Sequence, residues 1–248
     1  MISFTPEQRF IVTGASSGIG EGVALLLNEL GATVIAIARN QERLEAMQAK
    51  AKYSENVFLE RKDLAEDIAG LPTYVKILKE KYGKFQGMAL CAGIGRTAPL
   101  NAFDLNEAKQ IFDIDYFAPL MMTKGFIDRR INNGRGSAIV AISSIAGISC
   151  EKGLTTYGGA KAALSASLKS ASREAGMQGI RINCISPSFI DTPMTQSTPN
   201  EELLEKASKE YLFGFGTVSD AANMVIFLLS DKSKWITGQN YILDCGTY

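Results

Sequence analysis

Short runs rich in strand-forming residues alternate with longer helical patterns from one end of the chain to the other. We expect strands at Phe10–Thr13, Thr33–Ala38, Val57–Arg61, Gly87–Cys91, Ser137–Ser143, Arg181–Ser186 and Asn240–Asp244. We expect helices at Gly18–Leu30, Gln41–Ala51, Pro72–Tyr82, Leu105–Asn132, Thr156–Met177, Glu201–Tyr211 and Ser219–Leu229. Parallel strands need crossovers of helical length, so this alternation predicts a Rossmann-like, doubly wound α/β fold with a seven-stranded parallel sheet and helices on both faces.

Size and charge narrow the class of protein. The 248 residues can bury a large core in one domain, and the absence of repeats and linkers predicts a single domain over residues 1–248. The 26 basic and 26 acidic residues balance, which argues against nucleic acid or an anionic membrane as a partner. The chain has no signal-peptide pattern and no apolar run of about 18 residues, so we expect a cytoplasmic protein.

The first expected strand runs directly into the glycine-rich segment Gly14-Ala15-Ser16-Ser17-Gly18-Ile19-Gly20, where a helix begins. Glycines allow a tight turn, and the free N–H groups of the helix start can bind a pyrophosphate. Glycines also end strands for purely structural reasons. The strand-turn-helix context nevertheless favours dinucleotide binding.

The end of the second expected strand bears on which dinucleotide is bound. Folds that prefer NAD place an acidic residue there, about 20 positions after the glycine turn, to bind the ribose 2′-hydroxyl. This chain has Ala38 followed by Arg39, which can pair with a 2′-phosphate. NADP(H) is therefore favoured over NAD(H), the alternative being that Arg39 is only a solvated residue at a strand end.

Ser144, Tyr157 and Lys161 are the candidate catalytic residues. Tyr157 and Lys161 lie one helical turn apart, so the ammonium can lie beside the phenol and favour its phenolate form, while Ser144 can bond the same substrate oxygen. An isolated Tyr-x-x-x-Lys is more often a solvated helix face. The chain contains no histidine, however, which excludes Ser-His-Asp and Cys-His catalysis and strengthens the case for Tyr157.

The four cysteines, Cys91, Cys150, Cys184 and Cys245, are far apart and fit no Cys-x-x-Cys pattern. Reduced thiols are therefore expected and no metal site is predicted. Cys91 is interpreted as an inert strand cysteine, with a redox role as the alternative.

Taken together, these motifs resemble the short-chain dehydrogenase/reductase family, in its shorter single-domain type, over nearly the whole chain. The resemblance rests on Thr13-Gly14-x-x-x-Gly18-x-Gly20, Ala92-Gly93, Ser143-Ser144, Tyr157-x-x-x-Lys161 and Pro187 through Thr192. It implies hydride transfer between a nicotinamide cofactor and a ketone or secondary alcohol.

The resemblance also implies a role for each matching residue. Tyr157 is the general acid or base, Ser144 orients the substrate oxygen, and Lys161 supports Tyr157 and holds the nicotinamide ribose. The residues implied in cofactor binding are Gly14, Ser16, Ser17, Gly18, Ile19, Gly20, Arg39, Asp63, Leu64, Ala92, Gly93, Tyr157, Lys161, Pro187, Ile190 and Thr192. Asp63 is placed at the adenine, and Ile190 and Thr192 at the nicotinamide carboxamide.

Four positions depart from the family pattern, and Asp115 is the most consequential. It aligns with an asparagine that is thought to complete a proton relay near the lysine, so it is the fourth candidate catalytic residue. A carboxylate there can serve the same relay or pair with Lys161 and weaken its action on Tyr157. The milder departures are Leu90-Cys91, Ser188 and Cys245.

Substrate identity stays open at this level. An apolar set that could cover a substrate, or simply pack in the core, comprises Met194, Leu203, Leu204, Ala207, Tyr211, Leu212 and Phe213. Arg96 is interpreted as a solvated loop residue rather than an anion-binding one. The plan resembles 3-oxoacyl carrier-protein reductases, but other carbonyl reductases share it, and a non-catalytic NADP-binding sensor or scaffold is a further alternative. The resemblance also implies a homo-oligomer, a tetramer or dimer.

Overall fold

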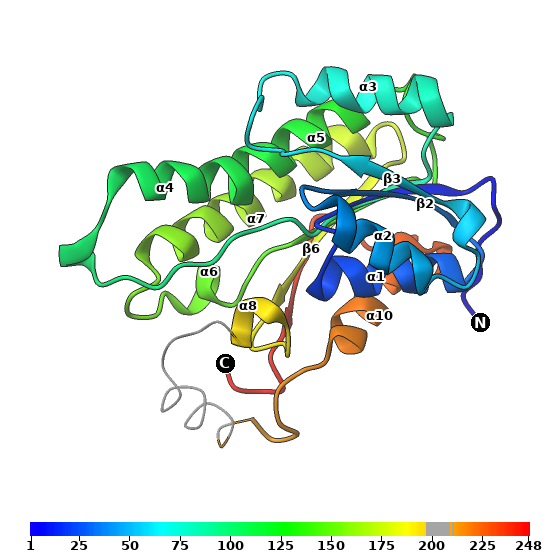
Figure 1. The fold of residues 1–248 in the computed structure, drawn as a ribbon. Helices are drawn as coiled ribbons and strands as arrows, with labels where there is room; N and C mark the ends of the chain where they lie inside the picture. Colours follow the sequence, from blue (N-terminus) through cyan, green and yellow to red (C-terminus); the bar gives the residue numbers. More distant parts are fainter. Residues whose placement is uncertain (197–208, 210) are drawn as a thin grey trace.

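The computed structural model describes residues 1–196, 209 and 211–248. Its seven strands form one parallel sheet in the order β3-β2-β1-β4-β5-β6-β7 (Figure 1). The strands are β1 Arg9–Thr13, β2 Thr33–Ala38, β3 Val57–Arg61, β4 Gly87–Leu90, β5 Ala138–Ile142, β6 Arg181–Pro187 and β7 Asn240–Leu243. The predicted fold class is therefore confirmed, and each strand ends within one residue of its expected limits.

Helices cover both faces of the sheet. Those of the described residues are α1 Gly18–Glu29, α2 Gln41–Ala49, α3 Leu71–Tyr82, α4 Leu105–Phe112, α5 Ala118–Phe126, α6 Ala146–Ser149, α7 Thr155–Gly176, α8 Pro193–Gln196 and α10 Val218–Leu229. Short 3₁₀ turns lie at Ser54–Asn56, Leu100–Ala102 and Asp231–Ser233. Helices α1, α2 and α10 lie on one face, and α3, α5 and α7 lie on the other (Figure 1).

The central strands of the sheet are buried on both faces, which explains why β2, β4 and β5 are almost entirely apolar rather than alternating. In β1, Phe10 and Val12 point into the core beneath α1 and α10, whereas Ile11 points into the core beneath α3, α5 and α7. The side chains of all three are fully buried. One strand thus contributes to two cores.

The order of the strands reverses at β1, which pairs with β2 on one side and with β4 on the other. At its carboxyl end Thr13 lies opposite Ile37 of β2 and Leu90 of β4. Chain connections leave such a point in opposite directions and open a crevice, where doubly wound folds bind ligands. The fold therefore places a crevice beside the glycine-rich turn.

The expected continuous helix Leu105–Asn132 is wrong in two respects. A π-helical turn, η3 at Asp113–Phe117, separates α4 from α5, and α5 ends at Phe126. The buried side chain of Asn132 donates to the carbonyls of Phe126 and Asp128, at 2.8 and 3.1 Å, and these bonds satisfy the helix end. The expected helix Glu201–Tyr211 lies outside the described residues except for 209 and 211.

A buried arginine ties the end of α10 to the sheet. Arg181, the first residue of β6, donates to the carbonyls of Leu228 and Ser230, at 2.7 and 2.9 Å, and to Ser233 Oγ at 2.8 Å. Its positive charge lies at the negative end of the helix dipole. Arg181 therefore fixes α10 relative to the strand that leads into the crevice.

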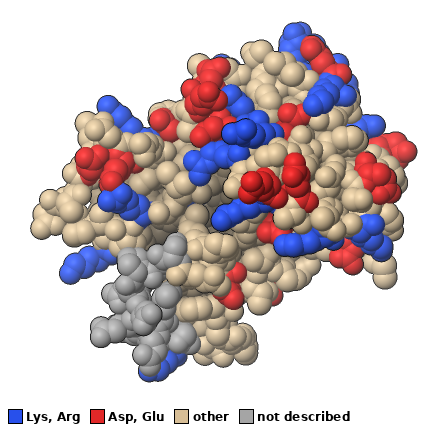
Figure 2. Space-filling view, viewed as in Figure 1, with Lys and Arg blue, Asp and Glu red and all other residues tan. Residues whose placement is uncertain are grey.

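The surface carries both signs of charge. On the face shown in Figure 2, lysines and arginines are interspersed with aspartates and glutamates. No helix within residues 1–196, 209 and 211–248 is long and apolar enough to cross a membrane.

Candidate active site

The glycine-rich turn has little room for side chains. A Cβ on Gly20 would lie 2.3 Å from the carbonyl oxygen of Gly14, and one on Gly14 would lie 2.9 Å from Ala92 Cα. Thr13 Oγ1 accepts hydrogen bonds from the N–H groups of Cys91 and Ala92, at 3.0 and 3.2 Å, and so fastens β4 to β1. The turn is therefore a tight backbone cradle.

The cradle opens at the start of α1. Ser17 is the extended N-cap of this helix, and its side chain caps no N–H group among the described residues. The first N–H groups of α1 therefore lack an intrahelical partner and can bind an anion, which the positive end of the helix dipole also favours. This geometry fits the pyrophosphate of a dinucleotide.

A single pocket of about 180 Å³ lies at the carboxyl ends of the strands. It brings together most of the site residues expected from the sequence: Gly14, Ser17, Gly18, Ile19, Gly20, Ala92, Gly93, Asp115, Ser144, Tyr157, Lys161, Pro187, Ile190 and Thr192. Ser188, Cys91 and Met194 also line it. Glycine cradle and candidate catalytic residues therefore share one pocket.

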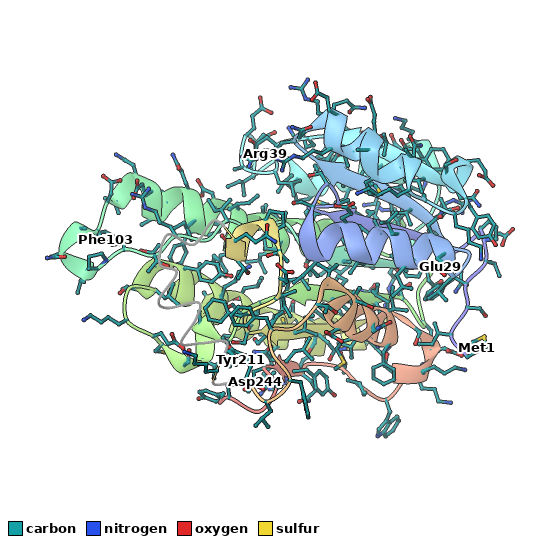
Figure 3. All side chains as sticks on the ribbon, turned by 60° about the horizontal axis from the view of Figure 1, so that its bottom comes forward. Met1, Glu29, Arg39, Phe103, Tyr211 and Asp244 are labelled. Carbon is teal, nitrogen blue, oxygen red and sulfur yellow. The ribbon has the colours of Figure 1, made fainter. Side chains whose placement is uncertain are left out.

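Four of the expected cofactor residues lie outside the pocket lining. Arg39, labelled in Figure 3, follows β2 at its carboxyl end. It forms an ion pair at 3.8 Å with Asp63, which lies just after β3, and 69% and 41% of the two side chains are exposed. Ser16 is partly exposed in the glycine turn, and Leu64 is buried in the core on the α3 face. Arg39 and Asp63 are thus available at the far end of the crevice, whereas Leu64 presents no exposed side chain.

Ser144 follows β5, and Tyr157 and Lys161 lie in the first two turns of α7. Ser144 Oγ accepts a hydrogen bond of 3.1 Å from the N–H of Ala146, which leaves its own proton available to a ligand. Lys161 Nζ lies 5.7 Å from the centroid of the Tyr157 ring. The serine, tyrosine and lysine thus converge as their spacing predicts.

Asp115 makes direct contact with the candidate lysine. Its Oδ1 lies 2.8 Å from Lys161 Nζ in a buried ion pair, without the alignment of a good hydrogen bond, and its Oδ2 accepts the N–H of Ile94 at 3.1 Å. Lys161 Nζ also donates to the carbonyl of Ile142 at 2.9 Å. The Asp115 side chain is fully buried because it projects from the π turn into the protein.

For each residue of this pair, burial and the neighbouring charge shift the pKa in opposite directions. Loss of water raises the pKa of Asp115, and the Lys161 ammonium and the Ile94 N–H offset part of that rise. Burial alone would lower the pKa of Lys161, but the charges of Asp115 and Tyr157 outweigh it and the pKa is raised. Lys161 therefore stays protonated across the physiological range.

Cys91 has the features of an inert thiol. It is partly buried at the end of β4, and loss of water raises its pKa to about 12. The reactive thiolate is scarce at such a pKa. The structure favours the interpretation as a packing residue over a redox role.

Several partners in this site have no signature in the sequence. The Ile142 carbonyl and the Ile94 N–H are backbone groups, and only the fold brings them to Lys161 and Asp115. Ser188, noted only as a departure from the family pattern, forms a short hydrogen bond with the hydroxyl of Tyr211. In the sequence, the only indication that Ser188 belongs to the site is its position next to Pro187 at the end of a strand.

The residues expected to cover a substrate are only partly described. Met194 lines the pocket, and Leu212 and Phe213 are exposed. Leu203, Leu204 and Ala207 lie outside the described residues. Arg96 forms an ion pair with Glu107, which agrees with its interpretation as a loop residue.

Comparison with known proteins places these features in a family. A family model described as Enoyl-(Acyl carrier protein) reductase matches residues 14–248. The chain is 34% identical to a 3-oxoacyl-(acyl-carrier-protein) reductase from Chlamydia muridarum over 99% of both chains. It is 31% identical to one from Thermotoga maritima, over 95% of this chain and 96% of the other.

Solved structures agree with this placement. A short-chain type dehydrogenase/reductase from Mycobacterium ulcerans is 28% identical and superposes with a TM-score of 0.89, which covers 99% of this chain and 91% of that one.

Proposed function

Since the chain belongs to the short-chain dehydrogenase/reductase family of oxidoreductases, we propose that it is an NADP(H)-dependent carbonyl reductase. It transfers a hydride between the nicotinamide and a ketone or secondary alcohol, in a single domain over residues 1–248. The observation that carries the proposal is the convergence of Ser144, Tyr157 and Lys161 in the same pocket as the glycine cradle.

The chemistry divides between cofactor and protein. When bound, the nicotinamide would supply the hydride to the carbonyl carbon. Ser144 Oγ donates a hydrogen bond to the carbonyl oxygen, and the Tyr157 phenol gives that oxygen its proton, so that an alcohol forms and a phenolate remains. The phenolate regains a proton from water before the next turnover. In the reverse direction the phenolate takes the proton of the alcohol.

The cradle supports binding of the cofactor. Gly14 in the turn, and Gly18 and Ile19 at the start of α1, would hold the pyrophosphate with backbone N–H groups. Arg39 would meet the 2′-phosphate, since Ala38 occupies the position at which an acidic residue would select NAD(H). Asp63 would meet the adenine, and Ile190 and Thr192 the carboxamide.

Oxidation of NADPH with a panel of ketones tests the proposal. Tyr157→Phe removes the proton donor and should lower kcat by about 100-fold or more, whereas Tyr53→Phe, on a partly exposed tyrosine before β3, should leave it unchanged. Equal turnover by wild type and Tyr157→Phe would refute the assigned role. Binding of NADPH without turnover of any ketone would favour the sensor or scaffold alternative.

A second candidate function is reduction of 3-oxoacyl groups on acyl carrier protein. The two curated relatives carry that name and are more than 30% identical over almost the full chain. The test compares kcat/KM for a 3-oxoacyl group on carrier protein with that for the same group on a small thiol. A much higher value on carrier protein would assign this function, and equal values would favour a small-molecule substrate.

We also propose that the chain forms a homo-oligomer, a dimer or tetramer. Large apolar side chains exposed around α4 support this: Phe103 is 48%, Leu105 59% and Phe117 43% exposed. Light scattering would decide it, and a monomer at micromolar concentration would refute it. The cytoplasmic location stays a prediction from the sequence.

A further inference from the structure

We infer that Asp115 is a positioning residue whose carboxylate holds the Lys161 ammonium in place and offsets part of the positive charge that Lys161 presents to the Tyr157 phenol. The inference rests on the proposed function, in which Tyr157 donates the proton.

The ammonium is held by oxygen atoms from separate elements of the fold. Asp115 Oδ1, from the π turn, lies 2.8 Å from Nζ, and the Ile142 carbonyl, at the end of β5, accepts from Nζ at 2.9 Å. The Ile94 N–H anchors the other carboxylate oxygen. The lysine side chain is only 4% exposed, so its position is set by these contacts.

Gly93 closes the backbone directly over the pair. A Cβ at this position would lie 2.5 Å from Asp115 Oδ1 and 3.3 Å from Lys161 Nζ. The absence of a side chain lets the chain approach the pair closely, and the side chains of Lys161 and Asp115 are 4% and 0% exposed. Charges in such surroundings interact more strongly than at the surface.

Few other charges face the pair. Those acting on Lys161 from the described residues are Asp115, Tyr157 on its own helix and the Cys184 thiol on β6, while Cys91 lies within reach just after β4. Burial raises the pKa of both thiols to about 12, so neither is charged near neutral pH. Asp115 is therefore the negative charge that balances Lys161.

The direction in which Asp115 affects Tyr157 follows from this balance of charges. A phenolate at Tyr157 is attracted by the ammonium and repelled by the carboxylate. An asparagine would have a similar shape without the charge, and would leave the attraction unopposed. A neighbouring charge shifts the midpoint of a titration by about 1–3 pH units. Because the Asp115 carboxylate acts on the phenol less directly than the ammonium does, we expect a change at the lower end of this range, about one pH unit.

The test titrates Tyr157 directly. Tyrosinate absorbance is followed against pH in wild type and in Asp115→Asn, and the same titration of each protein carrying Tyr157→Phe is subtracted. The midpoint should fall by about one unit in Asp115→Asn and stay fixed in Asp113→Asn, the same change two residues earlier in the π turn. The measurement needs no turnover, so it stands apart from the test of the proposed function.

An unchanged or higher midpoint in Asp115→Asn overturns the inference. A lower melting temperature with an unmoved midpoint also overturns it, because that result would show a purely structural role. If Asp115→Asn does not fold, Asp115→Ser repeats the titration. If neither variant folds, the pair is a requirement of folding and the inference is rejected.

Discussion

Replacement of Arg39 by alanine should weaken NADPH binding while leaving NADH binding within about twofold of wild type. Arg39 is 69% exposed at the carboxyl end of β2 and pairs with Asp63 at 3.8 Å. The 2′-phosphate of NADPH would take over this pairing, since a guanidinium binds phosphate through a planar fork. NADH has no such phosphate, so the arginine contributes little to its binding.

The two interactions differ in strength. An exposed ion pair such as Arg39–Asp63 contributes about 0–1 kcal/mol, so releasing Arg39 costs little. A hydrogen bond to a charged group contributes about 1.5–3 kcal/mol. The net gain of about 0.5–3 kcal/mol corresponds to a loss of about 2- to 150-fold in NADPH affinity in Arg39→Ala.

Titration of cofactor fluorescence would measure both dissociation constants. Arg173→Ala is the matched control, because it removes an exposed arginine from the last turn of α7, outside the pocket lining. An equal loss of affinity for NADH and NADPH in Arg39→Ala would show that Arg39 does not recognise the phosphate. An unchanged affinity for NADPH would refute the assignment altogether.

Three further variants test the site and its support. Gly93→Ala should lower kcat at least about tenfold, because its Cβ would displace Asp115, and unchanged kinetics would contradict this. Arg181→Met should lower the free energy of unfolding in urea by about 3 kcal/mol, since buried carbonyls lose a charged donor; a loss below about 1 kcal/mol would speak against it. Thr217→Ala removes the capping box of α10 and should cost about 1 kcal/mol. The bond from Thr217 lowers the pKa of Asp220, so this stabilisation is present above about pH 4 and fades as acid protonates the carboxylate. If the difference in free energy of unfolding between variant and wild type stayed constant down to about pH 2, the linkage would be contradicted.

The strands and the glycine cradle could be predicted because their signals are local. Buried parallel strands form near-continuous apolar runs, and glycine turns require a residue without Cβ wherever backbones touch. A Cβ on Gly14 would clash with the backbone of Ala92, and a Cβ on Gly20 would clash with the carbonyl oxygen of Gly14. Such features are properties of a few neighbouring residues.

The π turn that separates α4 from α5 lies just before Pro119, which is a local helix-breaking signal, whereas the end of α5 depends on a contact from outside the helix. Residues Leu105 to Asn132 contain no internal signal strong enough to end a helix at Phe126, and Asn132 ends it by folding back on the helix carbonyls. The sequence leaves open whether Asp115 pairs with Lys161 or serves the same proton relay as an asparagine. It depends on the π turn, which sets the direction of the carboxylate.

The order of the strands also has a consequence for how the chain can assemble as it is synthesised. β2 adds to one side of β1 and β3 adds to β2, then β4 adds to the other side of β1, followed outward by β5, β6 and β7. Each new strand thus joins a free edge, and none has to insert between two strands already paired. The sheet can therefore be built outward from β1 in the order in which its strands are synthesised. The crevice beside the glycine-rich turn can form when β4 joins β1, before Tyr157 has been synthesised.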